Sequence, residues 1–172
     1  MGCLNLKILL MGVAGTGKTT VGRILAQNIS AHFIDADDFH CSSSIEKMRM
    51  GYPLNDEDRK QWIERLFEEI EGRRCQDRPL VIACSALRRS IQELFKKNKF
   101  LIFYLHANEK TLIRRLKKRQ GHFFGSELLD SQFEALELPA HVEYINVETQ
   151  VSAVVRQCER KIFRMQRKED LS

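Results

Sequence analysis

The chain has 172 residues, of which 28 are Lys or Arg and 23 are Asp or Glu, so its formal net charge is +5. Hydrophobic residues make up 43% of it, which is enough to form a core and excludes a disordered or fibrous protein. Its apolar runs are far shorter than the ~20 residues that a membrane-spanning helix needs. We therefore expect a single soluble domain over residues 1–172, without a membrane partner.

Short apolar runs alternate along the chain with segments that carry apolar residues at helical spacing. The expected strands are residues 6–11, 33–34, 80–84, 100–105 and 144–147. The expected helices are residues 19–30, 58–71, 90–97, 109–119 and 152–167. This alternation predicts an α/β fold, a three-layer α/β/α sandwich around a five-stranded parallel sheet. The two long segments that remain, 39–56 and 121–141, are predicted to be irregular functional loops.

A phosphate-binding motif lies between the first expected strand and the first expected helix. Residues 12–19 read Gly-Val-Ala-Gly-Thr-Gly-Lys-Thr and match G-x-x-x-x-G-K-[ST]. The glycines let backbone N–H groups form a nest for phosphate oxygens, and the helix that follows adds the positive end of its dipole. Lys18 is expected to reach the β- and γ-phosphates of ATP, and the Thr19 hydroxyl to bind Mg²⁺. The expected ATP-binding residues are Gly12, Val13, Ala14, Gly15, Thr16, Gly17, Lys18, Thr19, Thr20 and Arg115.

An acidic cluster follows the second expected strand, whereas the third strand ends without a carboxylate for the metal. In an extended chain, Asp35 and Asp37 face one side and Asp38 faces the other. We expect Asp35 to hold the water shell of the metal and Asp37 to orient the hydroxyl that accepts the phosphoryl group. The alternative is an acidic turn that only caps a helix.

Two arginines share a face of the helix over 109–119, because Arg115 and Arg119 are four residues apart. They are placed to close over a triphosphate as part of a mobile lid at about 119–140, with Arg119 as a catalytic residue. The alternative is a solvated basic face, which is also the favoured interpretation of the basic run 160–168 over nucleic-acid binding.

The five cysteines are widely spaced and form no C-x-x-C pair, which predicts neither a disulfide framework nor a zinc site. A reducing, cytoplasmic location fits this pattern best.

Several strings, in order along nearly the whole chain, resemble the small P-loop gluconate kinases, relatives of shikimate and adenylate kinases. The most specific are Pro-Leu-Asn-Asp-Glu-Asp-Arg at 53–59, Arg-Gln-Gly-His-Phe-Phe at 119–124 and Ser-Gln-Phe-Glu at 131–134. The resemblance implies that the protein transfers the γ-phosphoryl group of ATP to the 6-hydroxyl of D-gluconate. It also implies ATP and Mg²⁺ as cofactors and a homodimer.

The resemblance also assigns roles to residues. It implies Lys18, Asp37 and Arg119 as catalytic residues, Thr19 and Asp35 at the metal, and a substrate-binding region at about 39–72. The substrate-binding residues that it implies are Asp37, His40, Lys47, Arg49, Arg59, Arg88, His122 and Gln132.

The chain departs from the family pattern at Ile91 and Gln92, where the family has Tyr and Arg. If that arginine touches substrate, its absence weakens gluconate binding or changes the preferred acid. One alternative therefore stays open, a kinase of another small hydroxylated acid such as shikimate. A second alternative, from the basic run 160–168, is a P-loop RNA-binding protein.

Overall fold

The computed structural model describes residues 6–72, 78–118 and 126–169. Five strands form one sheet: β1 (Lys7–Met11), β2 (His32–Asp35), β3 (Leu80–Ala83), β4 (Phe100–His106) and β5 (Glu143–Asn146). Their order across the sheet is β2-β3-β1-β4-β5, and every neighbouring pair is parallel. The first strand, β1, is therefore central, with β3 and β2 on one side of it and β4 and β5 on the other. A crevice at the carboxyl end of such a central strand is where ligands bind in folds of this type.

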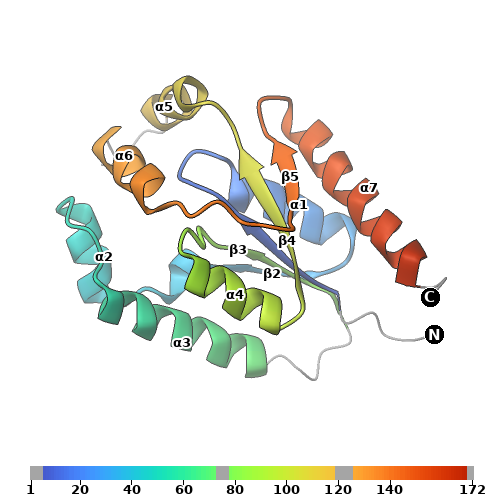
Figure 1. Ribbon diagram of the computed structural model, residues 1–172, viewed down its shortest axis with the longest axis horizontal. Coiled ribbons are helices and arrows are strands. Elements are labelled where there is room, and N and C mark those ends of the chain that lie inside the picture. Colours follow the sequence, from blue (N-terminus) through green and yellow to red (C-terminus); the bar gives the residue numbers. More distant parts are fainter. Residues whose placement is uncertain (1–5, 73–77, 119–125, 170–172) are drawn as a thin grey trace.

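Helices cover both faces of this sheet (Figure 1). On one face α1 (Lys18–Asn28) and α7 (Val151–Glu169) pack against Ile8 and Leu10 of β1. On the other face α3 (Asp56–Gly72) and α4 (Arg89–Lys97) pack against Leu9 and Met11. Successive residues of β1 thus point into two separate cores, as a continuous apolar run in a parallel sheet should. The predicted three-layer α/β/α fold is confirmed.

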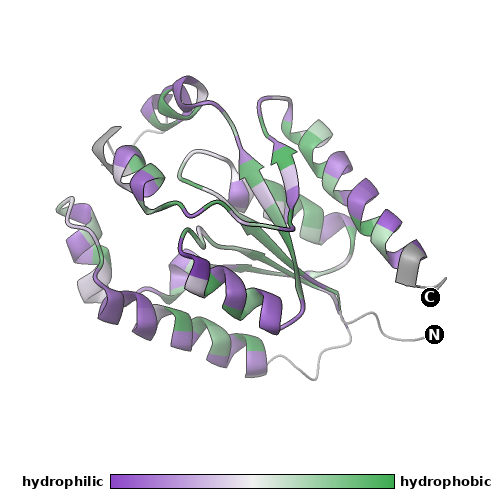
Figure 2. Cartoon of the chain, viewed as in Figure 1, coloured by the Kyte–Doolittle hydropathy of each residue, from purple (hydrophilic) through white to green (hydrophobic). Residues whose placement is uncertain are grey.

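The remaining helices, α2 (Ser42–Arg49), α5 (Glu109–Lys118) and α6 (Ser126–Ala135), lie beside or beyond the edge where the strands end (Figure 1). Figure 2 shows that hydrophobic residues gather in the strands and on the sides of the helices that face them. In the described ranges, no helix combines the length and the apolar character that crossing a membrane requires.

The ten expected strands and helices are present, with ends shifted by one or two residues in most cases, but two expectations about irregular segments are wrong. Residues 39–56 contain α2, and residues 121–141 contain α6. The helix α2 escapes a periodicity search because only Ile45 and Met48 are apolar in its eight residues. In α6, Leu129 and Phe133 continue to Leu136 at helical spacing, so a signal was present in the sequence.

The expectation of an extended chain after β2 is also wrong. Residues Ala36–Phe39 form a short 3₁₀ helix, η1, with Asp35 as its N-cap. The alternation of sides that an extended chain imposes therefore does not apply to Asp37 and Asp38.

Candidate active site

The phosphate loop joins β1 to α1, and several protein contacts fix its backbone. Its glycines at 12, 15 and 17 have φ values of +144°, +81° and +86°, which only glycine adopts without strain. A Cβ atom on Gly12 would lie 2.4 Å from the carbonyl oxygen of Leu105, at the end of β4. The hydroxyl of Thr16, which is 1% exposed, donates to the carbonyl of Val13 at 2.8 Å. The backbone that forms the nest is thus already arranged.

The side chain of Lys18 folds back over this loop. Its Nζ donates to the carbonyl oxygens of Gly12 at 2.9 Å and Val13 at 3.1 Å. Lys18 is also the first residue of α1, so its charge and the positive end of the helix dipole act on the same space.

Thr19 and Asp35 meet across the gap between α1 and the end of β2. The Thr19 hydroxyl donates to Asp35 Oδ2 at 2.7 Å, while Asp35 Oδ1 accepts from the backbone N–H of Asp37 at 3.2 Å. Asp35 therefore caps η1 with one carboxylate oxygen and accepts from Thr19 with the other.

A hydroxyl beside a carboxylate suits Mg²⁺, which prefers oxygen ligands and takes several of them from water and substrate phosphates. Within the described residues, no group of three or more His, Cys, Asp or Glu side chains could hold a metal ion. The donor set therefore fits an ion held together with a nucleotide rather than in an all-protein cage.

Asp37 lies at this edge and is exposed to solvent. The pKa of Asp37 is nevertheless raised above its ordinary value, chiefly because surrounding protein atoms desolvate the carboxylate, while the charge of Lys18 opposes the shift. Repulsion from Asp35 and Asp38 adds to the increase. A carboxylate with a raised pKa is a better proton acceptor.

His40 stacks on Trp62 of α3, with ring centroids 4.6 Å apart and the planes 13° from parallel. Trp62 is fixed in turn, since its Nε1 donates to the carbonyl of Ala36 at 2.6 Å. Burial, with a smaller contribution from Arg65, lowers the pKa of His40 to about 4. The ring is therefore neutral at pH 7 and can exchange hydrogen bonds with hydroxyl groups, but it cannot serve as a cation.

Trp62 and Arg65 belong to this site but were not among the predicted site residues. Arg65 Nη1 donates to the carbonyl of Phe39 at 3.4 Å. The spacing of three residues that places both side chains on one face of α3 is the signal that could have found them.

Two of the cations assigned to the substrate already have carboxylate partners. Lys47 Nζ contacts both oxygens of Asp58, at 2.8 and 2.7 Å. Arg59 donates to Asp56 at 2.9 Å. Arg49, at the end of α2, is exposed and forms no ion pair among the described residues.

Arg59 and Arg88 line one surface pocket of about 330 Å³ together with residues of α3 and α4. Neither Lys18 nor Asp37 lines this pocket. The structure therefore brings these two arginines together, but not onto the phosphate loop.

Two predicted residues contact the phosphate loop from α5 and α6. Arg115 donates to the carbonyls of Gly15 and Val147. Gln132 Oε1 accepts from the backbone N–H of Ala14 at 2.6 Å. Thr20 is exposed on α1, and Arg119 and His122 lie outside the described residues.

The departure at Gln92 has a structural explanation. Gln92 is 1% exposed, and its Nε2 donates to the carbonyls of Ala86 at 3.1 Å, Leu87 at 3.3 Å and Glu137 at 2.8 Å. The side chain joins the loop after β3 to the segment after α6.

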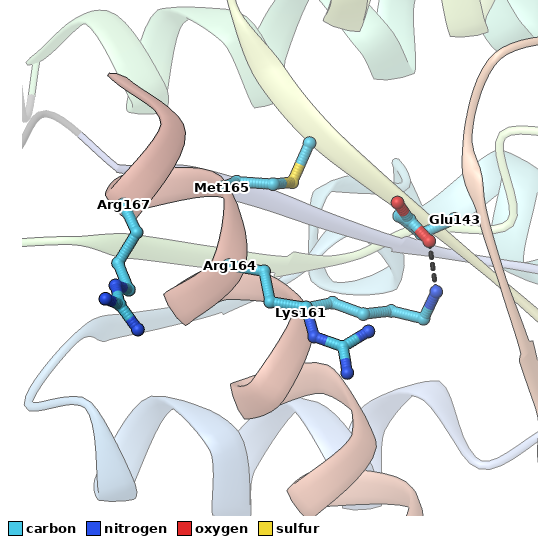
Figure 3. Close-up of a pocket in the computed structure, with 5 residues that line it drawn as sticks. All are labelled: Glu143, Lys161, Arg164, Met165 and Arg167. Carbon is cyan, nitrogen blue, oxygen red and sulfur yellow. Dashed lines mark hydrogen bonds and ion pairs between the residues drawn. The ribbon is translucent and has the colours of Figure 1, made fainter. Parts of the chain in front are cut away.

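A larger pocket, of about 400 Å³, lies away from this site. It is lined by Glu143, Lys161, Arg164, Met165 and Arg167 (Figure 3). Glu143 begins β5, the strand at one side of the sheet, and pairs with Lys161, while the other lining residues belong to α7. The pocket is not part of the candidate active site.

The chain is similar to known proteins over most of its length. The shikimate kinase family matches residues 14–167. A probable gluconokinase of Dictyostelium discoideum is 38% identical over 168 residues, which cover 89% of this chain and 84% of that protein. The thermosensitive gluconokinase of Escherichia coli (strain K12) is 37% identical over 161 residues, which cover 90% of this chain and 86% of that protein.

The fold is likewise similar to a solved structure. The crystal structure of a gluconokinase from Sinorhizobium meliloti 1021 has a TM-score of 0.84 at 32% sequence identity, and the match covers 97% of each chain.

Proposed function

Because the chain belongs to the gluconokinase family of small P-loop kinases, we propose that it transfers the γ-phosphoryl group of ATP to the 6-hydroxyl of D-gluconate. The product is 6-phospho-D-gluconate. The observation that carries the proposal is the meeting of the phosphate loop with the end of β2, where Thr19 bonds Asp35 at 2.7 Å. The identity of the acceptor is supported by the relatives and by the family-specific strings.

On the nucleotide side, the loop N–H groups and the start of α1 hold the phosphates. From its position over the carbonyls of Gly12 and Val13, Lys18 reaches the β- and γ-phosphates, where its charge neutralises the transferring group. Thr19 directly and Asp35 through water would hold Mg²⁺, which neutralises phosphate charge when bound.

On the acceptor side, Asp37 orients the primary hydroxyl. In a loose phosphoryl-transfer transition state the hydroxyl proton leaves late, so a positioned acceptor matters more than a strong base. Neutral His40, stacked on Trp62, forms one hydrogen bond with a hydroxyl of the sugar acid through Nε2, because its Nδ1 is buried.

The carboxylate of gluconate needs a cation, and a guanidinium binds a carboxylate through two hydrogen bonds. We assign this role first to Arg49, because Lys47 and Arg59 already bind Asp58 and Asp56. We assign substrate binding to the region 39–72. We assign Arg119 and His122 to the lid, where Arg119 contacts the phosphates and His122 the substrate.

We also propose that the protein is a cytoplasmic homodimer without a nucleic-acid partner. Cys41, Cys84 and Cys158 are free thiols, which suits a reducing compartment. Light scattering of the eluted protein should give twice the chain mass, and a mass of one chain would reject the dimer.

The acceptor is tested by measuring ADP release from ATP and Mg²⁺ with D-gluconate, shikimate and other sugar acids at matched concentrations. We expect the highest kcat/KM for D-gluconate. A higher value for shikimate or another acid would replace the acceptor while leaving the kinase assignment intact. ADP release that does not depend on any acid would reject the proposed function.

A further inference from the structure

We propose that Gln132 is a positioning residue that sets where Lys18 lies, through the peptide bond between Val13 and Ala14. Through this contact, the packing of α6 against the phosphate loop affects the rate of phosphoryl transfer. The inference rests on the proposed function, because it assumes phosphoryl transfer from ATP. It does not depend on which acid accepts the phosphoryl group.

One peptide unit carries the contact. Its N–H, on Ala14, donates to Gln132 Oε1 at 2.6 Å. Its carbonyl, on Val13, accepts from Lys18 Nζ at 3.1 Å and from the Thr16 hydroxyl at 2.8 Å. A peptide that is hydrogen-bonded at both ends is fixed in orientation, and each bond polarises the other. Gln132 and Lys18 thus act on opposite ends of the same unit.

Hydrophobic packing brings Gln132 to this place. Leu129, which is fully buried, and Phe133 of α6 pack with Val13 of the loop and Leu112 of α5. Val13, one of the residues that α6 packs against, is therefore also the residue whose carbonyl accepts from Lys18. If α6 left the loop, the peptide would lose the acceptor for its N–H and the contact that restrains it.

The segment after α6 is anchored separately. The backbone N–H of Glu137 donates to the carbonyl of Leu87 at 2.9 Å, and Gln92 donates to the carbonyl of Glu137. A change at Gln132 can therefore alter the loop contact while the end of this segment stays attached.

A neutral acceptor suits this position. A glutamate would accept from Ala14 as well, but its charge would repel phosphate oxygens and attract Lys18. A methionine has similar length and no strong acceptor, so it would leave the N–H of Ala14 without a side-chain partner. These two changes separate the hydrogen bond from the packing and from the charge.

The kinetic test compares Gln132→Met with Glu134→Gln, a control at an exposed residue of α6. The acceptor substrate in this test is the acid that gives the highest kcat/KM among D-gluconate, shikimate and the other sugar acids. We expect Gln132→Met to lower kcat about tenfold or more and to change the acceptor KM less than about threefold, while the control keeps the wild-type values. A raised acceptor KM at normal kcat would overturn the proposal in favour of direct substrate binding.

A double-mutant cycle isolates the route through Lys18. In a Lys18→Met background, adding Gln132→Met should cause no further loss of kcat, because the residue that it positions is gone. Losses that multiply would overturn the proposal.

A readout independent of catalysis is the backbone amide resonance of Ala14. Its proton should move upfield in Gln132→Met and stay hydrogen-bonded in Gln132→Glu and Glu134→Gln. An unchanged Ala14 resonance in Gln132→Met would overturn the proposal whichever acid is phosphorylated. If the resonance and the double-mutant cycle behave as expected while gluconate is not phosphorylated, only the proposed acceptor fails.

Discussion

The phosphate side and the acceptor side of the active-site edge are built differently. On the phosphate side, one short string supplies the loop, Lys18 and Thr19, although contacts from Gln132 of α6 and Arg115 of α5 help to hold the loop. On the acceptor side, the candidate cations come from α2, α3 and the N-cap of α4, and two of them bind carboxylates of the protein. The comparison teaches that the groups that bind phosphate come from one string, whereas acceptor choice depends on how separate elements share their charges.

The largest effect is expected at Lys18. Lys18→Met removes the charge that meets the transferring phosphoryl group, so kcat should fall at least about a hundredfold. Circular dichroism should show an intact fold, since Lys18 is not one of the buried residues that form the core. Lys110→Met, at an exposed lysine of α5, is the control and should keep wild-type turnover. Turnover of Lys18→Met within a few-fold of wild type would contradict the assignment.

The next largest effect is expected at Asp37. Asp37→Asn keeps the shape and removes the proton acceptor, which should cost about 10²–10⁴ in kcat with little change in ATP affinity. Asp38→Asn is the matched control, because it changes the neighbouring exposed carboxylate. Steady-state kinetics with calorimetric ATP titrations measures both. If Asp38→Asn were the crippled variant and Asp37→Asn nearly normal, the roles would have to be exchanged.

Arg49 and Lys47 test the acceptor side directly. Arg49→Met should raise the gluconate KM with little change in kcat, because it removes a cation that is available to the substrate. Lys47→Met breaks the pair with Asp58 and should mainly lower the melting temperature by a small amount, since Lys47 is 40% exposed. The opposite pattern, a raised KM only in Lys47→Met, would show that the pair opens to receive the substrate.

The smallest effect is expected in the pH dependence of the free energy of unfolding, to which His40 contributes. Because the pKa of His40 is lowered to about 4 in the folded protein, the native state resists a proton that the unfolded chain binds near pH 6.5. The free energy of unfolding should therefore fall as the pH drops from 6.5 toward 4. Urea unfolding at pH 7 and pH 5 measures this decrease in the free energy of unfolding, which should be smaller in His40→Gln than in the wild-type protein. His32→Gln, which leaves His40 in place, is the control, and equal losses in all three proteins would contradict the shift.

The sequence predicted the fold well because its signals are strong and local. Apolar runs such as 80–84 mark strands buried on both faces, and the glycines at 12, 15 and 17 mark a backbone that other residues cannot adopt. The α2 and η1 segments were missed because they have few apolar residues, and their course depends on contacts such as that of Trp62 with Ala36.

The candidate site was predicted where one string defines it and less well where it is assembled from distant parts. The sequence analysis assigned Thr19 and Asp35 to one metal site, and the structure brings these two side chains together. The partners of Lys47 and Gln92 were not, because residues far from them in the sequence or on other elements decide them. Sequence spacing does not specify which carboxylate or carbonyl a side chain will find.

The most direct test of the account is to identify the hydroxyl that is phosphorylated. Wild-type protein, ATP, Mg²⁺ and D-gluconate labelled with carbon-13 are incubated, and the phosphorus–carbon couplings of the product are read by NMR. The account predicts one phosphate ester, at carbon 6, whose rate of formation falls sharply in Asp37→Asn and only slightly in Asp38→Asn. An ester at another carbon, or no ester of gluconate while a different acid is phosphorylated, would contradict it.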